Sequence, residues 1–275
     1  MKKIGVLAVI VCMMAVVNFA SADIIRGINI DFVTIGNPGN ATDPATGSLY
    51  GAVSYNYRIG KYEVTAHQYQ TASAVGGFNT GFGSGDMPVY YVSWFDAARF
   101  CNYLTTGNKD IGVYNISGSS VEIMDHQLAG STYGVAYFLP SEDEWYKAAY
   151  YKPDGSGYSI FANGTNVAPI AGIETNYNAG YGQYWAVGSG AMEQNGTFDM
   201  MGNRDEWTEG LDIEGRRIIR GGNCRSSASY LMSSMRLSTT PYNQSQIGFR
   251  IASIPEPATL SLLGLGGLIL RRKRS

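Results

Sequence analysis

A short apolar segment lies at each end of the chain, and the two segments limit the fold to the residues between them. At the N-terminus, Lys2 and Lys3 precede an apolar run over residues 4–17, which ends on small residues at positions 20–22. A basic start, an apolar stretch and a small-x-small ending are typical of a secretory signal peptide. We expect cleavage after Ala22, since no stop-transfer flank supports a retained anchor. Residues 1–22 are therefore excluded from the fold, and the protein is exported.

The C-terminus has three parts in a fixed order: a Pro-Glu-Pro motif, an apolar stretch and a basic end. They are Pro255, Glu256 and Pro257, residues 258–270, and Arg271 and Arg272 with two further basic residues. As a helix the apolar stretch would rise only about 20 Å, short of the ~30 Å hydrocarbon core. The basic end suits a cytoplasmic flank. The segment is thus either a short tail anchor or a signal that is held in the membrane and then cleaved.

This order of motif, hydrophobe and basic end resembles a PEP-CTERM sorting signal over residues 254–275. The resemblance implies an exosortase-type membrane protease as a partner. It also implies a Gram-negative cell envelope or outer surface as the destination. The C-terminal segment would lie in the inner membrane before sorting.

The charge of the remaining part excludes some partners. The two N-terminal lysines and four C-terminal basic residues are six of the chain's 20 Lys and Arg, and Glu256 is one of its 22 Asp and Glu. The part between the signals therefore carries 14 positive and 21 negative charges, a net charge of −7. Such a surface disfavours nucleic acid and anionic membranes as partners, and it is compatible with bound cations.

Residues 23–253 are enough for one domain with a hydrophobic core. The chain has 35 Gly and 20 Tyr but only 15% charged residues, which indicates many turns and loops packed by aromatic rings. The sequence predicts an opening strand and loop within 24–43 and, from alternating residues, a strand at 55–59. It also predicts short strands near 218–220 and 247–251, each beside a Gly. Residues 153–190 show no clear periodicity. The sequence therefore predicts an α+β domain rich in loops.

Three capping boxes predict short helices, because an N-cap hydroxyl and an N3 carboxylate or amide satisfy the free backbone donors of a first turn. The second helix should end near Gly107 and place Cys101 on its buried face. The boxes are Thr65 with Gln68, Ser93 with Asp96, and Ser141 with Glu144.

An ordered set of short motifs resembles the formylglycine-generating enzyme, or sulfatase-modifying factor, family. The motifs are Tyr-Glu-Val-Thr at 62–65, Met-Pro-Val at 87–89 with Val-Ser-Trp-Phe-Asp-Ala at 92–97, Leu-Pro-Ser-Glu-Asp-Glu-Trp at 139–145, Gly-Thr-Phe-Asp-Met-Met-Gly-Asn-Arg-Asp-Glu-Trp at 196–207, Arg-Gly-Gly at 220–222, Arg236 and Gly-Phe-Arg at 248–250. The resemblance implies the formylglycine-generating-enzyme fold. That fold is a C-type lectin-like variant with low regular secondary structure, short helices and small sheets.

The catalytic feature of that family is missing here. Active members resemble one another in a cysteine pair, five residues apart, that binds copper(I) shortly after the Gly-Gly motif. In this chain the pair's positions fall near Ser226 and Leu231, and Cys224 comes two residues too early. Soft thiolates suit copper(I), and neither serine nor leucine replaces them. The sequence therefore argues against copper and against catalysis; a formylglycine-generating oxidase or a related metal-dependent oxygenase acting on a protein cysteine is the alternative.

Other metal and thiol chemistry has little support. His67 and His126 are the only histidines, too few for the three-histidine iron site of sulfoxide synthases. We expect His67 in the first helix and His126 in a loop. An oxidising compartment permits a disulfide between Cys101 and Cys224. Two separate buried thiols are the alternative, and we favour it slightly.

Calcium is the best cofactor hypothesis, because this cation takes six to eight oxygen ligands from loops rich in Asn, Asp, Glu and carbonyl groups. The loop at 202–207 is similar to the family segment that holds a structural calcium, so the resemblance implies Asn203 and Glu206 as ligands. Asn176 and Asn178 form a weaker second candidate. Alternatively, all these side chains brace their loops by hydrogen bonds.

Four aromatic residues of the irregular segment could form a platform for sugars or peptides, or could fill the core beneath the loops. They are Tyr177, Tyr181, Tyr184 and Trp185. We favour the core for most of them. Fold analogy and export, rather than these residues, favour a non-catalytic binding or structural module at the cell surface. Its expected partner is extracellular polysaccharide or protein.

Overall fold

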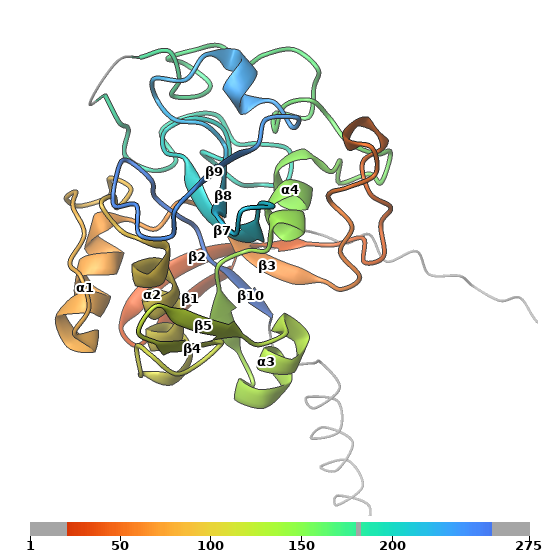
Figure 1. Cartoon of the computed structure of the whole chain (residues 1–275). Helices are drawn as coiled ribbons and strands as arrows, with labels where there is room; N and C mark the ends of the chain where they lie inside the picture. The colour runs from red at the N-terminus through yellow and green to blue at the C-terminus, as the bar shows by residue number, and fades with distance from the viewer. Residues whose placement is uncertain (1–20, 180–182, 255–275) are drawn as a thin grey trace, which may run out of the picture.

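The computed structural model describes residues 21–179 and 183–254. Most of the signal peptide, Tyr181 and the sorting motif (Pro255, Glu256, Pro257, Arg271 and Arg272) lie outside the described residues. Figure 1 shows a single body with short helices and small sheets in its lower and central parts, and long loops at its top. No helix in the described ranges is long and apolar enough to cross a membrane.

Five antiparallel strands form the central sheet in the order β1-β2-β3-β10-β6. They are β1 (Ser21–Ile25), β2 (Ile28–Ile35), β3 (Tyr57–Gly60), β10 (Ala252–Ile254) and β6 (Ala136–Phe138). Ala252 pairs with Ile59 on one side and Phe138 on the other, so the end of the domain lies inside the sheet. Cleavage after Ala22 would leave three residues of β1.

Two helices, α1 (Ala66–Gly76) and α2 (Trp94–Thr106), pack against each other and against β2 and β6 respectively (Figure 1). A third, α4 (Glu142–Tyr150), contacts β7. All three begin at the predicted capping boxes, and both reciprocal hydrogen bonds are present in each box. Gly107 ends α2 in the left-handed conformation, as predicted.

A fourth helix, α3 (His126–Tyr133), was not predicted, and the expectation that His126 lies in a loop is wrong. Asp125 caps this helix by accepting from Leu128 N at 2.9 Å. Position N3 is Leu128, so the acidic or amide half of a capping box is missing and the sequence signal is weak. His67 lies in α1, as expected.

The remaining strands form a three-stranded sheet and a hairpin. The sheet contains β7 (Glu206–Leu211), β8 (Arg217–Arg220) and β9 (Leu237–Thr239), and the hairpin contains β4 (Tyr114–Ser117) and β5 (Ser120–Ile123). The strand predicted at 247–251 is wrong in position. That segment makes only an isolated bridge between Gly248 and Glu206, and the ladder begins at Ala252.

Three tryptophans anchor the core where the helices meet the second sheet. Trp94, Trp145 and Trp207 are completely buried. Their indole N–H groups donate to Thr208 O (2.9 Å), Glu206 Oε2 (2.8 Å) and Val92 O (3.0 Å) respectively. Each ring thus buries its apolar surface without leaving an unpaired donor. The motifs that carry these residues are scaffold elements that position the loops above them.

Candidate functional site

Residues 151–205 form the long irregular part of the domain, with isolated β-bridges but no helix or strand in their described part. In Figure 1 these green and cyan loops lie at the top, together with the short helix η2 (Ala228–Leu231). Backbone bonds from Asn178 N to Ser226 O (3.0 Å) and from Ala179 N to Cys224 O (2.7 Å) join the two segments. The candidate site is built on this junction.

Asn203 ties three distant segments together from beneath the junction. Its backbone is in the left-handed conformation (φ 52°), which asparagine tolerates. Its Nδ2 donates to Glu63 Oε2 at 2.7 Å, and its Oδ1 accepts from Trp185 N (2.9 Å) and Asn176 Nδ2 (3.0 Å). The structure thus brings Asn176 and Asn203 together.

Glu206 is held in a buried ion pair. Its carboxylate accepts from Arg250 Nη2 (2.6 Å), Arg250 Nε (2.7 Å) and Trp145 Nε1 (2.8 Å). Arg250 also donates to Gly60 O (3.0 Å) and Phe198 O (2.9 Å), so it connects the central sheet to the loops. Asn203 and Glu206 therefore brace the loop, which is the alternative that the sequence left open.

Calcium stays a prediction, and Asn176 is the residue that fits it. The buried Oδ1 of Asn176 has no hydrogen-bond partner within the described ranges. A hard cation takes such an oxygen as a ligand. Asn178 is exposed at the surface. Among residues 21–179 and 183–254, no group of three or more His, Cys, Asp or Glu could hold a metal ion.

Four buried carboxyl groups lie near the buried guanidinium of Arg250, which forms an ion pair with one of them, Glu206. They are Glu63, Glu193, Asp199 and Glu206. Burial and mutual repulsion raise the pKa of Glu63 above its usual range, that of Glu193 to about 8 and that of Asp199 to about 6. Glu193 accepts from Met200 N and Met201 N, each at 3.1 Å, and so organises the loop ahead of Asn203.

Arg204 lies between two aromatic rings at the edge of the junction. The centre of its guanidinium is 4.0 Å from the ring centroid of Tyr90 and 3.2 Å from that of Tyr184. Its Nη1 donates to Gln246 Oε1 at 2.6 Å. Although this arginine is only 1% exposed, the two rings beside it reach the surface. Sequence reasoning missed this arrangement.

Cys101 and Cys224 are both buried, and no disulfide joins them in the described part of the chain. The structure thus has two separate thiols, which is the alternative that the sequence favoured. Cys101 lies in α2 within the hydrophobic core, whereas Cys224 lies beside Tyr184 and Arg204 in the loop region. Burial raises the pKa of both thiols, which disfavours the reactive thiolate.

A copper thiolate pair does not fit these residues. Ser226 Oγ accepts from Asn223 N at 3.0 Å, and Leu231 is completely buried in the core. Cys224 therefore has no thiol partner in its own loop. The loop can position hydrogen-bonding groups, but it cannot supply a pair of soft ligands.

Two open cavities flank the chain at Cys224. One has a volume of about 470 Å³ and the other about 430 Å³. The first is lined by Gly172, Ile173, Tyr184, Trp185, Ala186 and Ser189, and the second by Asn223, Arg225, Ser226, Ser227 and Tyr230. Tyr184 and Trp185 are thus half-buried rings that line a cavity, an arrangement compatible with the platform that the sequence offered as one of two interpretations. Tyr177 lies partly beneath, where its hydroxyl donates to Pro169 O at 2.7 Å.

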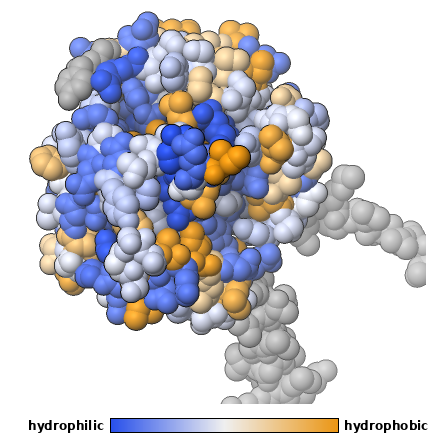
Figure 2. Space-filling model, viewed as in Figure 1, coloured by the Kyte–Doolittle hydropathy of each residue, from blue (hydrophilic) through white to orange (hydrophobic). Residues whose placement is uncertain are grey.

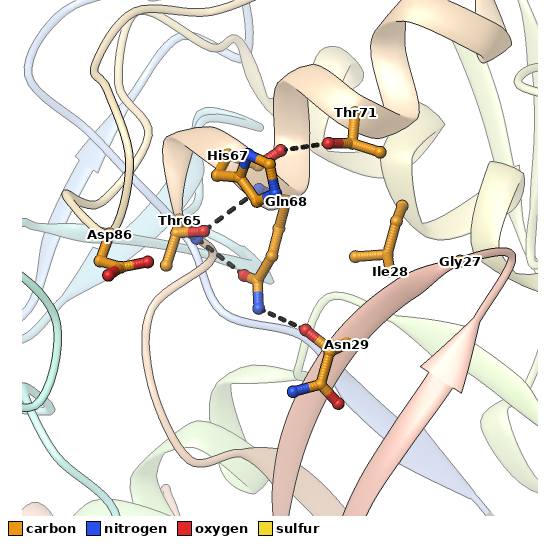
Figure 3. Close-up of a pocket in the computed structure, with 8 residues that line it drawn as sticks. All are labelled: Gly27, Ile28, Asn29, Thr65, His67, Gln68, Thr71 and Asp86. Carbon is orange, nitrogen blue, oxygen red and sulfur yellow. Dashed lines mark hydrogen bonds between the residues drawn. The ribbon is translucent and has the colours of Figure 1, made fainter.

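A third cavity, of about 310 Å³, lies at the start of α1 (Figure 3). Its polar groups are largely used by the capping box: Thr65 Oγ1 accepts from Gln68 N (3.1 Å), and Gln68 Nε2 donates to Asn29 O (2.7 Å). The next backbone donor, His67 N, bonds to Gly85 O at 3.0 Å. The helix start therefore offers few free donors, and the cavities beside Cys224 are the better candidate.

The chain is similar to several known proteins. It is 27% identical over 206 residues to the chaperone protein LppX of Paenibacillus barcinonensis. The aligned region covers 66% of this chain and 71% of that protein. Among solved structures, Treponema denticola variable protein 1 has a TM-score of 0.64 at 23% identity and covers 86% of this chain and 99% of its own. PvdO from Pseudomonas aeruginosa has a TM-score of 0.57 at 18% identity, with 82% and 94% covered. The structural neighbours confirm the predicted formylglycine-generating-enzyme-like α+β fold.

Two family matches agree with the motifs. Residues 253–274 match the PEP-CTERM protein-sorting motif, which implies an exported protein that an exosortase sorts to the cell envelope. Residues 52–254 match the sulfatase-modifying factor enzyme 1-like domain. The chain therefore belongs to the sulfatase-modifying factor, or formylglycine-generating enzyme, family.

Proposed function

We propose that this exported protein is a non-catalytic binding module of the cell envelope, and that its ligand is an extracellular polysaccharide. The binding surface, called the ligand face below, is defined by Tyr184, Trp185, Asn223, Ser226 and Tyr230. These residues line the two cavities on either side of Cys224.

The observation that carries the proposal is the loop that begins at Asn223. Its two copper-ligand positions hold Ser226 and Leu231, and its outer surface forms an open cavity lined by hydroxyl, amide and guanidinium groups. A loop that performs thiol chemistry elsewhere in the family here offers hydrogen bonds to a ligand.

The neighbouring cavity adds the second element of carbohydrate binding. Tyr184 and Trp185 present half-buried rings beside Ser189. Flat rings stack on the C–H faces of sugars, while hydroxyl and amide groups bond to their hydroxyls. Figure 2 shows apolar side chains in small groups between polar ones on the viewed face, rather than in one large patch of the kind that a permanent protein partner covers.

The test is cosedimentation of the purified full chain with polysaccharide extracted from the matrix of the producing bacterium. We expect binding, and we expect Ser227→Trp to weaken it at least about tenfold, because Ser227 is exposed and lines the second cavity. Ser120→Trp, at an exposed position in the β4–β5 hairpin, is the matched control. Equal binding by both variants, or none by the unaltered protein, contradicts the proposal.

A protein ligand is the second candidate, and the relative named as a chaperone protein favours it. The same two variants distinguish the candidates when envelope proteins replace the polysaccharide. Retention of a defined envelope protein, lost in Ser227→Trp and kept in Ser120→Trp, would favour this second candidate over polysaccharide.

We also propose that calcium stabilises the loops through Asn176 Oδ1. Support comes from the burial of this oxygen and its lack of a partner within the described part of the chain. Calcium should raise Tm above the value in a chelator, and Asn176→Ala should abolish the difference. An identical Tm with calcium and with chelator rejects the ion.

A further inference from the structure

Three aromatic rings form a surface cluster next to the ligand face, and we call Phe82, Tyr90 and Tyr91 the aromatic platform. The ring centroids of Phe82 and Tyr91 are 5.1 Å apart, and each is 5.5–6.0 Å from Tyr90. Phe82 is 59% exposed and Tyr91 is 41% exposed. Large exposed rings that contact one another are typical of interaction sites, because a stable monomer gains nothing from displaying them.

The backbone fixes the rings in this position. Phe82 and Tyr90 exchange two backbone hydrogen bonds (2.8 and 3.1 Å). Tyr91 adopts the left-handed conformation (φ 58°), which is strained for a bulky residue. Its N donates to Ser245 O (3.0 Å) and its O accepts from Asn79 Nδ2 (3.1 Å). The fold thus stabilises an unfavourable conformation whose effect is to display a ring.

The platform is continuous with the ligand face. Tyr90 stacks against Tyr184 with a centroid distance of 6.2 Å and an interplanar angle of 22°. The guanidinium of Arg204 lies against both rings, and Gln246 accepts hydrogen bonds from both Arg204 Nη1 (2.6 Å) and the Tyr184 hydroxyl (2.5 Å). A chain-like ligand in the Tyr184 cavity would therefore reach the platform across connected aromatic surface.

Three segments near the platform contain no charged residue. Residues 77–85, 183–189 and 240–246 contain no Asp, Glu, Lys or Arg, although the part between the two sorting signals has a net charge of −7. The amide side chains of Asn243 and Gln244 lie in the third segment, which accepts a hydrogen bond from Tyr91 N at Ser245 O, and we call them the rim. Each has an amide oxygen that accepts no hydrogen bond within the described residues. Within these three segments an acidic polymer would find no cation and a basic peptide no carboxylate. The charged groups beside them include the buried Arg204 and the exposed Asp86, which adjoins the first segment.

We propose that the aromatic platform is a stacking site for a neutral polysaccharide of pyranose sugars that also contacts the ligand face. This inference rests on the proposed function and names the class of polysaccharide. The rings of Phe82 and Tyr91 stack on sugar C–H faces, and the amides of the rim accept hydrogen bonds from sugar hydroxyls.

The test is native affinity electrophoresis of the full chain in gels that contain glucan, mannan, galactan or xylan, with alginate as the acidic polymer. At least one neutral polysaccharide should retard the protein, and alginate should not. Phe82→Ser and Tyr91→Asn should each weaken the retardation about tenfold, which is the scale of one lost ring contact. Asparagine is chosen because it tolerates the left-handed backbone. Ile213→Ser, at a fully exposed turn residue, is the control, and thermal melts verify that each variant folds.

Each contrary outcome has its own meaning. If the platform variants migrate like the unaltered protein while Ser227→Trp loses retardation, the platform is rejected and the proposed function stands. Absence of retardation in every neutral gel rejects the platform as a site for neutral polysaccharide, whereas the proposed function is rejected only if the matrix polysaccharide also fails to bind. Equal retardation by alginate rejects a neutral ligand. A dimer that Phe82→Ser dissociates, without any retardation, assigns the platform to a second copy of the chain and overturns the proposal.

Discussion

The central sheet with its helices and the loops of residues 151–205 are held by different kinds of interaction. In the sheet region, backbone ladders pair the strands and side chains such as Phe32, Ile59 and Phe100 are completely buried. In the loops, buried polar side chains bond to the backbone. Asn195 Nδ2, for example, donates to Ala148 O (2.9 Å) and Tyr151 O (2.7 Å). Where strand ladders are missing, side chains must pair with the buried backbone N–H and C=O groups, because leaving such groups without hydrogen bonds lowers the stability of the fold.

This difference explains how one fold can vary its site. The sheet region depends on the pattern of apolar residues, which tolerates substitutions that preserve volume. The loop region depends on particular atoms of Glu193, Asn203 and Arg250, so its shape is specific and its outer surface is free to change. The predictions below compare the two regions, beginning with the largest expected effect.

Replacing Arg250 with methionine should give the largest loss of stability, because Arg250 bonds to both regions and forms the buried ion pair with Glu206. We expect the free energy of unfolding in urea to fall by about 3–5 kcal/mol, since this change leaves Glu206 buried and unpaired. The exposed Arg216→Met, whose ion pairs lie at the surface, is the control and should be nearly neutral. Similar losses in both variants would show that the ion pair does not connect the regions.

His126→Asn tests an ionic contact within the more regular region. The ring bridges Glu144 Oε1 and Glu209 Oε2, each at 3.1 Å, and stacks on Phe138. Burial alone would lower the pKa of His126, but the two carboxylates raise this pKa well above its usual value. Folded His126 therefore keeps its proton where the unfolded residue loses it. The stabilisation is complete below about pH 6.5 and is lost as pH rises through the folded pKa.

We accordingly expect His126→Asn to cost about 2 kcal/mol at pH 6 and less at strongly alkaline pH, measured by urea unfolding. Gln127→Ala, the exposed neighbour in α3, should be nearly neutral at both values. A cost that is independent of pH would mean that the ring acts through packing rather than through charge.

Asp199→Asn should stabilise the loops at neutral pH. The pKa of Asp199 is raised to about 6, mainly by burial. Between its ordinary value and about 6 the folded protein binds more protons than the unfolded chain, so stability falls as pH rises through this window and stays lower above it. Asparagine keeps the oxygen that accepts from Gly188 N and tolerates the backbone (φ 58°).

The free energy of unfolding of the variant should therefore exceed that of the unaltered protein by about 1–3 kcal/mol at pH 7, and by little at pH 4. Thermal melts across this range measure the difference. If the two proteins keep the same pH profile, folding does not raise the pKa of Asp199, and burial penalises its charge less than we propose.

Ser93→Ala should have the smallest effect. Its hydroxyl accepts from Asp96 N at 3.1 Å in the capping box of α2. Loss of such a cap costs about 1 kcal/mol, and the loss should be confined to the helix region. Hydrogen exchange should then increase at the start of α2 and not in the loops. A change of exchange in the loops would show that the two regions are more closely coupled than we propose.

The sequence predicted the features that depend on neighbouring residues. The capping boxes of α1, α2 and α4 use contacts three residues apart, and all were confirmed. The short strands of β4, β5 and β6 were missed, because three or four residues give no periodic signal. The strand near the C-terminus was placed too early, since Gly248 bonds to Asp205 O and Trp207 N, and Phe249 O accepts from Val64 N, without forming a ladder.

The site was harder to predict because it depends on residues that are distant in the sequence. Asn203 was identified from its loop motif, but its bond to Glu63 spans 140 residues, and no local pattern indicates it. The stacking of Arg204 on Tyr90 and Tyr184 was missed for the same reason. The aromatic content of residues 177–185 was the available signal, and it indicated the correct segment without its partners.

The most direct test of the central claim measures copper binding and cysteine oxidation together. The purified full chain is titrated with copper(I), and a peptide that contains a sulfatase-type cysteine is then incubated with it in the presence of oxygen. We predict no stoichiometric copper and no oxygen-dependent oxidation of the peptide, because Cys224 is buried and lacks a second thiol. Stoichiometric copper that is lost in Cys224→Ser, together with turnover of the peptide, would contradict a binding module and identify an oxidase.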